Sequence, residues 1–127
     1  MRQWFFPLAA CAVIGVGCGQ KASPAERYFR DKPVSHWLQA AHDPNPKIRK
    51  TAMDVLGNVS TSDPAAIPML TESLADKDAR VREAAVLALA KIGSPAASAL
   101  PQIEALSNDA DAKVREAAAL AVPRIKG

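Results

Sequence analysis

The stretch "DKDARVREAAVLALAKIG", from Asp76 to Gly93, has a close copy, "DADAKVREAAALAVPRIKG", from Asp109 to Gly127. Arg82 and Arg115 occupy the same place in the two copies and lie 33 residues apart, and Arg49 lies 33 residues before Arg82. Self-similarity at a fixed spacing of this kind is the sequence signature of repeat proteins. The body of the chain is therefore predicted to consist of three copies of one unit.

The same spacing holds at further positions along the unit, where the three copies carry identical or similar residues. These sets are Trp37, Leu70 and Ile103; Asp43, Asp76 and Asp109; Ile48, Val81 and Val114; Ala52, Ala85 and Ala118; Leu56, Leu89 and Val122; Val59, Ile92 and Ile125. So many aligned positions exclude coincidence. They place the units at about residues 33–62, 63–94 and 95–127, which together form one domain over residues 33–127.

The second half of each unit has the periodicity of an amphipathic helix. In the middle copy, apolar residues recur at i, i+3, i+4, i+7, i+8 and i+11 from Val81 to Ile92, which places them on one helical face. Asp78 is a suitable N-cap for this helix and Gly93 a suitable stop. Pro123 replaces the alanine of the middle copy inside the last helix, and we expect a kink or fraying near residues 120–122.

The first half of each unit predicts a second, shorter helix. In the first unit, Ser35 is expected to cap this helix and Trp37 to face the core. In the other two units, Pro68 and Pro101 are expected to restart the helix one turn after it begins. Hydrophobic residues make up 49% of the chain but aromatic residues only 5%, a composition that favours closely packed helices over a sheet. The predicted fold is all-α, a short solenoid of three helix pairs.

The pattern D-x-x-x-x-[IV]-R-x-x-A, with "VREAA" twice at the same phase, resembles the HEAT repeat. The resemblance is strongest to the short phycobilisome-lyase-type repeats, and it covers residue 33 to the end of the chain. It implies a right-handed α-solenoid whose second helices line the concave side and which binds other proteins. The subclass also leaves open an accessory role to a chromophore-attaching lyase, against which the small size and the export signal described next both argue.

The N-terminus, "MRQWFFPLAACAVIGVGCGQKASP", differs from the repeats. Arg2 precedes an apolar run from Trp4 to Gly17, the layout of a secretory signal, and the run is shorter than the ~20 residues of a spanning helix. "GVGC" resembles the end of a bacterial lipoprotein signal. Residues 1–17 are thus predicted to be a signal peptide, with cleavage before Cys18 and lipidation of Cys18.

Several features of this segment leave alternatives open. Gly15 stands where leucine is usual in lipoprotein signals, and "LAAC", ending at Cys11, fits the tetrapeptide better but leaves a shorter apolar run. An ordinary signal peptide and an uncleaved anchor are the other possibilities. Residues 18–32 are polar and predict a flexible tether with a reach of about 20 Å. The localisation that follows is an exported bacterial cell envelope protein, lipid-anchored at a membrane.

The repeated acidic and basic residues could suggest chemistry, but they recur once per unit, whereas catalysis needs a single asymmetric constellation. We interpret them as a structural ladder, in which each aspartate caps a turn and pairs with the arginine of its own or the adjacent unit. The ladder comprises Asp43, Arg49, Asp76, Arg82, Asp109 and Arg115. His36 and His42 lie six residues apart, on opposite faces of a helix, and predict no metal site. No motif supports an enzyme or a cofactor, and the net charge of +3 is too small to predict nucleic-acid binding.

The residues that differ between copies are the better candidates for function. They occupy the face of each second helix that lies opposite the alanines and combine basic residues with two leucines. The predicted partner-binding face comprises Lys47, Lys50, Arg80, Glu83, Leu87, Lys91, Lys113, Glu116, Leu120 and Arg124. Solenoids often bind partners on such a surface, and we expect an acidic protein segment here. A merely solvated face is the alternative. A structural envelope protein that self-associates through its apolar C-terminal edge is a further possibility.

Overall fold

The computed structural model describes residues 28–59 and 65–127. The predicted signal peptide, Cys18 and most of the predicted tether lie outside this range. Two short strands come first, β1 (Tyr28–Phe29) and β2 (Lys32–Pro33), paired antiparallel. The remaining elements are helices, namely α2 (Val34–Ala40), α3 (Pro46–Val59), α4 (Ala66–Ser73), α5 (Ala79–Ile92), α6 (Leu100–Ala105) and α7 (Ala112–Lys126), with 3-10 helices η2 (Ser94–Ala99) before α6 and η3 (Leu106–Asn108) after it.

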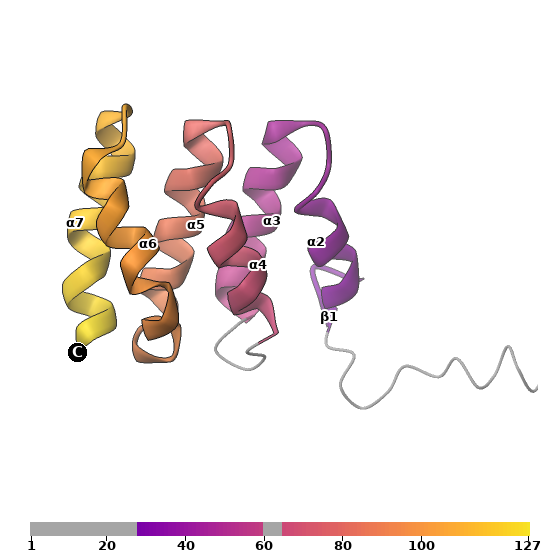
Figure 1. Cartoon of the computed structure of the whole chain (residues 1–127). Helices are drawn as coiled ribbons and strands as arrows, with labels where there is room; N and C mark the ends of the chain where they lie inside the picture. The colour runs from indigo at the N-terminus through magenta and orange to yellow at the C-terminus, as the bar shows by residue number, and fades with distance from the viewer. Residues whose placement is uncertain (1–27, 60–64) are drawn as a thin grey trace, which may run out of the picture.

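The helices form three pairs that stand side by side in one row (Figure 1). Helices α2, α4 and α6 make one layer, and α3, α5 and α7 make a second layer behind it. Helix α5 packs against both α3 and α7, so each unit contacts the next through its second helix. The all-α solenoid predicted from the repeat is therefore confirmed.

Local signals set where the second helices begin and end. The Asp78 side chain accepts a hydrogen bond from the backbone N–H of Arg80, which confirms the predicted N-cap of α5. Asp111 caps α7 in the same way, and Asn45 accepts from the N–H of Lys47 at the start of α3. Gly93 ends α5 with a φ of 79°, a conformation that residues with a Cβ rarely adopt.

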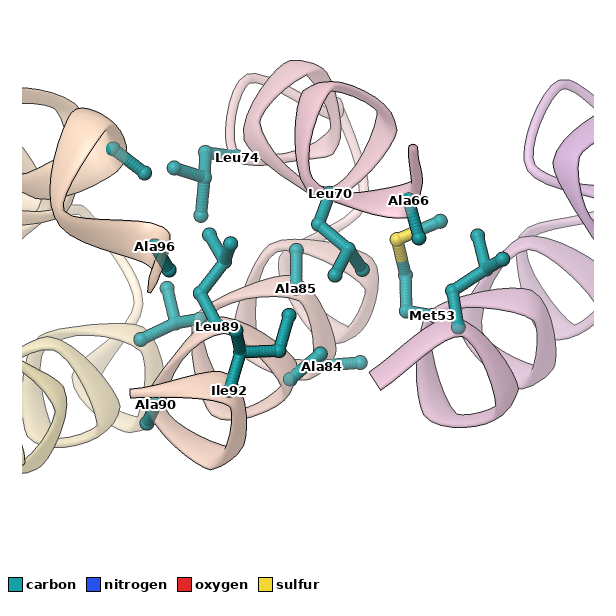
Figure 2. Packing of buried hydrophobic residues seen from close by; sticks show 14 of the residues in the cluster. Met53, Ala66, Leu70, Leu74, Ala84, Ala85, Leu89, Ala90, Ile92 and Ala96 are labelled. Atoms are coloured by element: carbon teal, nitrogen blue, oxygen red, sulfur yellow. The ribbon is translucent and has the colours of Figure 1, made fainter. Parts of the chain in front are cut away.

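The core is one continuous cluster of buried side chains that runs from α2 to α7. Figure 2 shows its middle part, around α4 and α5. Val81, Ala85 and Leu89 from the predicted face of α5 are fully buried. Small residues allow close approach between units, as at Gly57 of α3. A Cβ placed there would lie 2.7 Å from the Ala88 Cβ of α5. The repeated alanines thus permit the helix spacing of the stack.

The first helix differs in part from the prediction. Ser35 does not cap α2, because the helix begins at Val34 and Pro33 takes the N-cap position without a side-chain hydrogen bond. Trp37 packs against the core as predicted. Ordered backbone also begins earlier than we expected, since the β1–β2 hairpin occupies residues that were predicted to belong to the tether.

The two prolines inside the later helices behave differently. In the third unit, η2 ends at Ala99 and α6 begins at Leu100, beside Pro101, as predicted. Pro123 was predicted to kink or fray α7, but the helix continues without interruption to Lys126. Pro123 is an exposed residue, and so is Ala119, whose carbonyl loses its donor to the proline. Water can therefore replace the missing hydrogen bond, and the helix tolerates the proline.

Candidate functional site

The ladder residues lie at the ends of the helix pairs, where each loop leads into a second helix. Arg49 donates from Nε and Nη2 to both carboxylate oxygens of Asp76 in the next unit, at 2.8 and 3.0 Å. Arg82 makes the same bidentate contact with Asp109, at 3.0 Å for both bonds. The side-chain pairing therefore joins adjacent units and not residues of one unit.

Each arginine also holds the loop of its own unit. The Nη1 groups of Arg49, Arg82 and Arg115 donate to the carbonyl oxygens of Asp43, Asp76 and Asp109 at 2.9, 2.7 and 2.7 Å. One guanidinium thus fixes the turn before its helix and, where a next unit follows, the turn of that unit as well. This arrangement uses the planar fork of arginine, which lysine lacks. We infer from it a role in setting the register of the stack.

Two carboxylates of the ladder, those of Asp76 and Asp109, are held in their ionised form. Burial alone would raise the pKa of Asp76, but hydrogen bonds from Arg49 and from the backbone of Asp78 outweigh it and lower the pKa. The hydrogen bonds from Arg82 lower the pKa of Asp109. At the N-cap of α5, the Arg80 guanidinium lowers the pKa of Asp78 to about 2. These groups are therefore charged throughout the physiological pH range, and none is poised for proton transfer.

The predicted partner-binding face lies on α3, α5 and α7, and its side chains are exposed except for the half-buried Glu83. Leu87 and Leu120 are 44% and 57% exposed, although most large apolar side chains of the described residues are buried. Both leucines lie on the second-helix layer, in adjacent units. Two exposed leucines among charged side chains make this face a candidate interaction surface.

A groove of about 380 Å³ crosses the middle of this face, between α3 and α5. Leu87, Lys91 and Arg124 line it together with Asp54 and Asn58 of α3 and the small residues of the interface. The Nζ of Lys91 donates to the side-chain oxygen of Asn58, so matching positions of adjacent units are in direct contact. The groove therefore combines an apolar wall with the cationic groups of Lys91 and Arg124 and with the carboxylate of Asp54, which is paired with Lys50.

Other members of the predicted face do not reach the groove. Arg80 forms an ion pair with Asp78 at 2.9 Å, and Lys50 forms one with Asp54, also at 2.9 Å. Lys47, Lys113, Glu116 and Leu120 are exposed on the same helices but do not line the groove. Exposed ion pairs of this kind are weak, so Arg80 and Lys50 can exchange their partners for groups on another molecule.

The sequence did not predict two grooves at the loop end of the stack. One lies between the first and second units and includes His42 and Glu72, and the other lies between the second and third units and is more apolar, with Leu74 and Leu106. They are equivalent positions of the repeat, because both have a ladder arginine and aspartate in their walls. The signal that could have located them is the phase of the repeat itself, which places each ladder pair at a unit boundary.

Over residues 28–59 and 65–127, no group of three or more histidine, cysteine, aspartate or glutamate residues is arranged to hold a metal ion. Within the same ranges, no helix combines the length and the apolar character needed to cross a membrane.

The fold and the ladder define the class of protein as an α-solenoid of stacked helix pairs. Residues 34–123 match the family model of HEAT repeats, and the chain therefore belongs to the HEAT-repeat family. HEAT repeats commonly act as protein-interaction scaffolds. No curated protein matches the sequence as a relative.

Proposed function

We propose that this chain is an exported, membrane-tethered scaffold that binds an acidic segment of a partner protein on the partner-binding face of α3, α5 and α7. The observation that carries the proposal is the groove between α3 and α5, where the half-exposed Leu87 lies beside Lys91 and Arg124. An apolar side chain flanked by carboxylates on the partner would match this arrangement, with the apolar contact giving affinity and the charges giving orientation.

The tethering half of the proposal rests on the N-terminal sequence. The apolar run from Trp4 to Gly17, the "GVGC" tetrapeptide and the following polar residues support lipidation of Cys18. Several acyl chains on one cysteine would suffice for stable anchoring, because each buried CH₂ contributes about 0.8 kcal/mol. Replacing Cys18 by serine should move the protein from the membrane fraction to the soluble fraction of the native cell. A protein that remains in the membrane fraction would contradict lipidation at this residue.

The binding half is tested by site-specific photo-cross-linking in the native cell. A cross-linking amino acid at position 87 should capture one partner, whereas the same group at Ser98, an exposed position of the other layer, should not. Reversing the charges at Lys47, Arg80 and Lys113 together should reduce capture at position 87 by at least about tenfold, because each charge contributes a fraction of a kcal/mol to several kcal/mol when its partner is present.

A matched control reverses three lysines outside the face, Lys32, Lys77 and Lys126, and should leave the capture unchanged. Equal capture from positions 87 and 98 would refute the proposed face. Equal loss in both triple variants would show that only net charge matters, and it would refute a specific role of Lys47, Arg80 and Lys113.

A further inference from the structure

The ladder is open at both ends within the described residues. Its rule is that the arginine of one unit binds the aspartate of the next, as in the contacts of Arg49 with Asp76 and of Arg82 with Asp109. Among the described residues, this rule leaves Arg115 without a following aspartate and Asp43 without a preceding arginine. The two unmatched groups carry opposite charges. Asp43 lies between α2 and α3 and Arg115 lies on α7, and these elements form opposite ends of the row in Figure 1.

The complete pairs Arg49–Asp76 and Arg82–Asp109 are called closed rungs below. Arg115 already has the side-chain geometry of the arginines in these closed rungs. Its Nη1 donates to the carbonyl oxygens of Asp109 and Ala110 at 2.7 and 3.1 Å, as the corresponding atom of Arg49 does with its own loop. In the closed rungs, Nε and Nη2 carry the contact to the next unit. In Arg115, these two groups have no acceptor among the described residues, and the side chain is exposed. The donor half of a rung is therefore preformed.

Asp43 presents the matching acceptor half. Its Oδ1 accepts from the backbone N–H of Asn45 at 2.8 Å, just as Asp76 and Asp109 accept from the N–H two residues further on at 2.9 Å. The carboxylate is thus oriented by the same local bond as in the closed rungs. No arginine or lysine among the described residues forms an ion pair with it.

We propose that a second copy of this chain supplies the missing partners, so that Arg115 of one molecule binds Asp43 of the next and the solenoid continues from molecule to molecule. Both the preformed geometry and the charge complementarity favour this occupant over an unrelated protein. The contact is heterologous, because one end of the molecule binds the other end, and it therefore leads to open chains and not to closed dimers.

The helix faces beside these two residues support the contact but limit its strength. Ile48 at the first edge is 40% exposed, whereas its counterparts Val81 and Val114 are fully buried. At the last edge, Ala119 is exposed although Val86, its counterpart in the second unit, is fully buried. Both edges therefore leave apolar side chains in water that a neighbouring unit covers inside the stack.

Pro123 weakens the fit at the far end of the last helix. The matching positions in the earlier units are Gly57 and Ala90, and Gly57 leaves no room even for a Cβ. A proline ring there prevents the same close approach, so we expect the two copies to meet mainly at the ladder end. The assembly should accordingly be weak, dependent on concentration and reduced by salt.

The test uses the full chain in a mild detergent, with mass measured by light scattering after size exclusion over a range of protein concentrations. The unmodified chain should show a mass that increases with concentration. Arg115→Glu and Asp43→Lys should each abolish this increase. A one-to-one mixture of the two variants should form alternating chains, because the unchanged Arg115 of one variant meets the unchanged Asp43 of the other and the two introduced charges are also opposite. The double variant, which restores opposite charges at the contact, should again form chains.

Folding controls keep the outcomes distinct. Asp43→Asn retains the acceptor for Asn45 but lacks the charge, and it should be folded by circular dichroism and yet no longer form chains. A mass that does not depend on concentration in the unmodified chain would overturn the proposal. So would assembly of equal extent in all variants, because the apolar N-terminal segment or another surface would then be responsible. The result does not depend on the partner-binding face, and cross-linking at position 87 tests that face separately.

Discussion

The two arginines Arg82 and Arg115 form a natural comparison, because both hold their own loop but only Arg82 also binds the next unit within one molecule. Arg82→Met should lower Tm by roughly 5–10 °C, since it leaves the largely buried carboxylate of Asp109 without its partner. Arg115→Met loses only the loop bonds and should lower Tm by less than half as much. Thermal melts by circular dichroism in dilute solution measure both changes, and equal losses would mean that the bond between units contributes nothing.

The lowered pKa values of Asp76, Asp78 and Asp109 predict how stability responds to acid. A carboxyl whose pKa is lower in the folded than in the unfolded state stabilises the fold above its ordinary value of 3.8. That stabilisation is lost as the pH falls toward about 2, where the folded-state pKa of Asp78 lies. We therefore expect the free energy of unfolding to be constant from pH 7 to about 5 and to fall between about pH 4 and 2.

Asp109→Asn isolates one contribution to this acid response. Asparagine can still accept from the backbone N–H of Asp111, but it does not titrate and cannot form the ion pair with Arg82. The variant should be less stable than the unmodified chain at pH 7 and should lose less stability between pH 4 and 2. Urea unfolding at a series of pH values gives both quantities, and parallel pH profiles for the two proteins would contradict the role assigned to Asp109.

At the scale of the helix, Gly57 presents two opposing effects. Alanine favours a helix over glycine by about 1 kcal/mol, but its Cβ would lie 2.7 Å from Ala88 Cβ and 3.0 Å from Ala88 Cα. Since both helices are held by their neighbours, overpacking at about 1–3 kcal/mol should prevail. We expect Gly57→Ala to reduce the free energy of unfolding by roughly 1 kcal/mol, measured by urea titration. Thr51→Ala, at an exposed position of the same helix, should be neutral or stabilising.

The sequence predicts a helix well where its signals are local and poorly where they depend on neighbouring structure. Helix periodicity and the caps at Asp78 and Gly93 are local, so the sequence alone located α5 correctly. Ser35 was expected to be a cap because of its residue type, but the start of α2 depends on the preceding hairpin, which no local pattern indicated.

The ladder residues could be found from their spacing, but their pairing could not. An arginine six residues after an aspartate can contact its own loop or the next one, and only the distance between stacked units decides which contact forms. The groove beside Leu87 also depends on the distance between stacked units, because its shape is set by how closely α3 and α5 approach each other at Gly57. Sequence therefore predicts the members of such a site better than their contacts.

For the whole molecule, the question is whether the three units unfold together. Solenoids are stabilised by each unit and by the interfaces between neighbours, and weak interfaces would let units unfold one at a time. Here the core is one cluster, and α5 packs against both α3 and α7. The ladder adds a bidentate bond at each of the two boundaries. Strong coupling between so few units predicts a single transition.

Trp37 allows this coupling to be measured, because it lies in the first unit and the only other tryptophan is Trp4. In a chain that begins at Tyr28, and so keeps every residue of the core cluster, fluorescence reports the first unit, whereas circular dichroism reports all the helices. Ile103→Ala removes a fully buried side chain from the third unit and should cost about 2–5 kcal/mol. With strong coupling, the Trp37 transition shifts to lower urea together with the circular dichroism transition. A Trp37 midpoint that stays in place while the helical signal is lost in two steps would show that the units unfold independently.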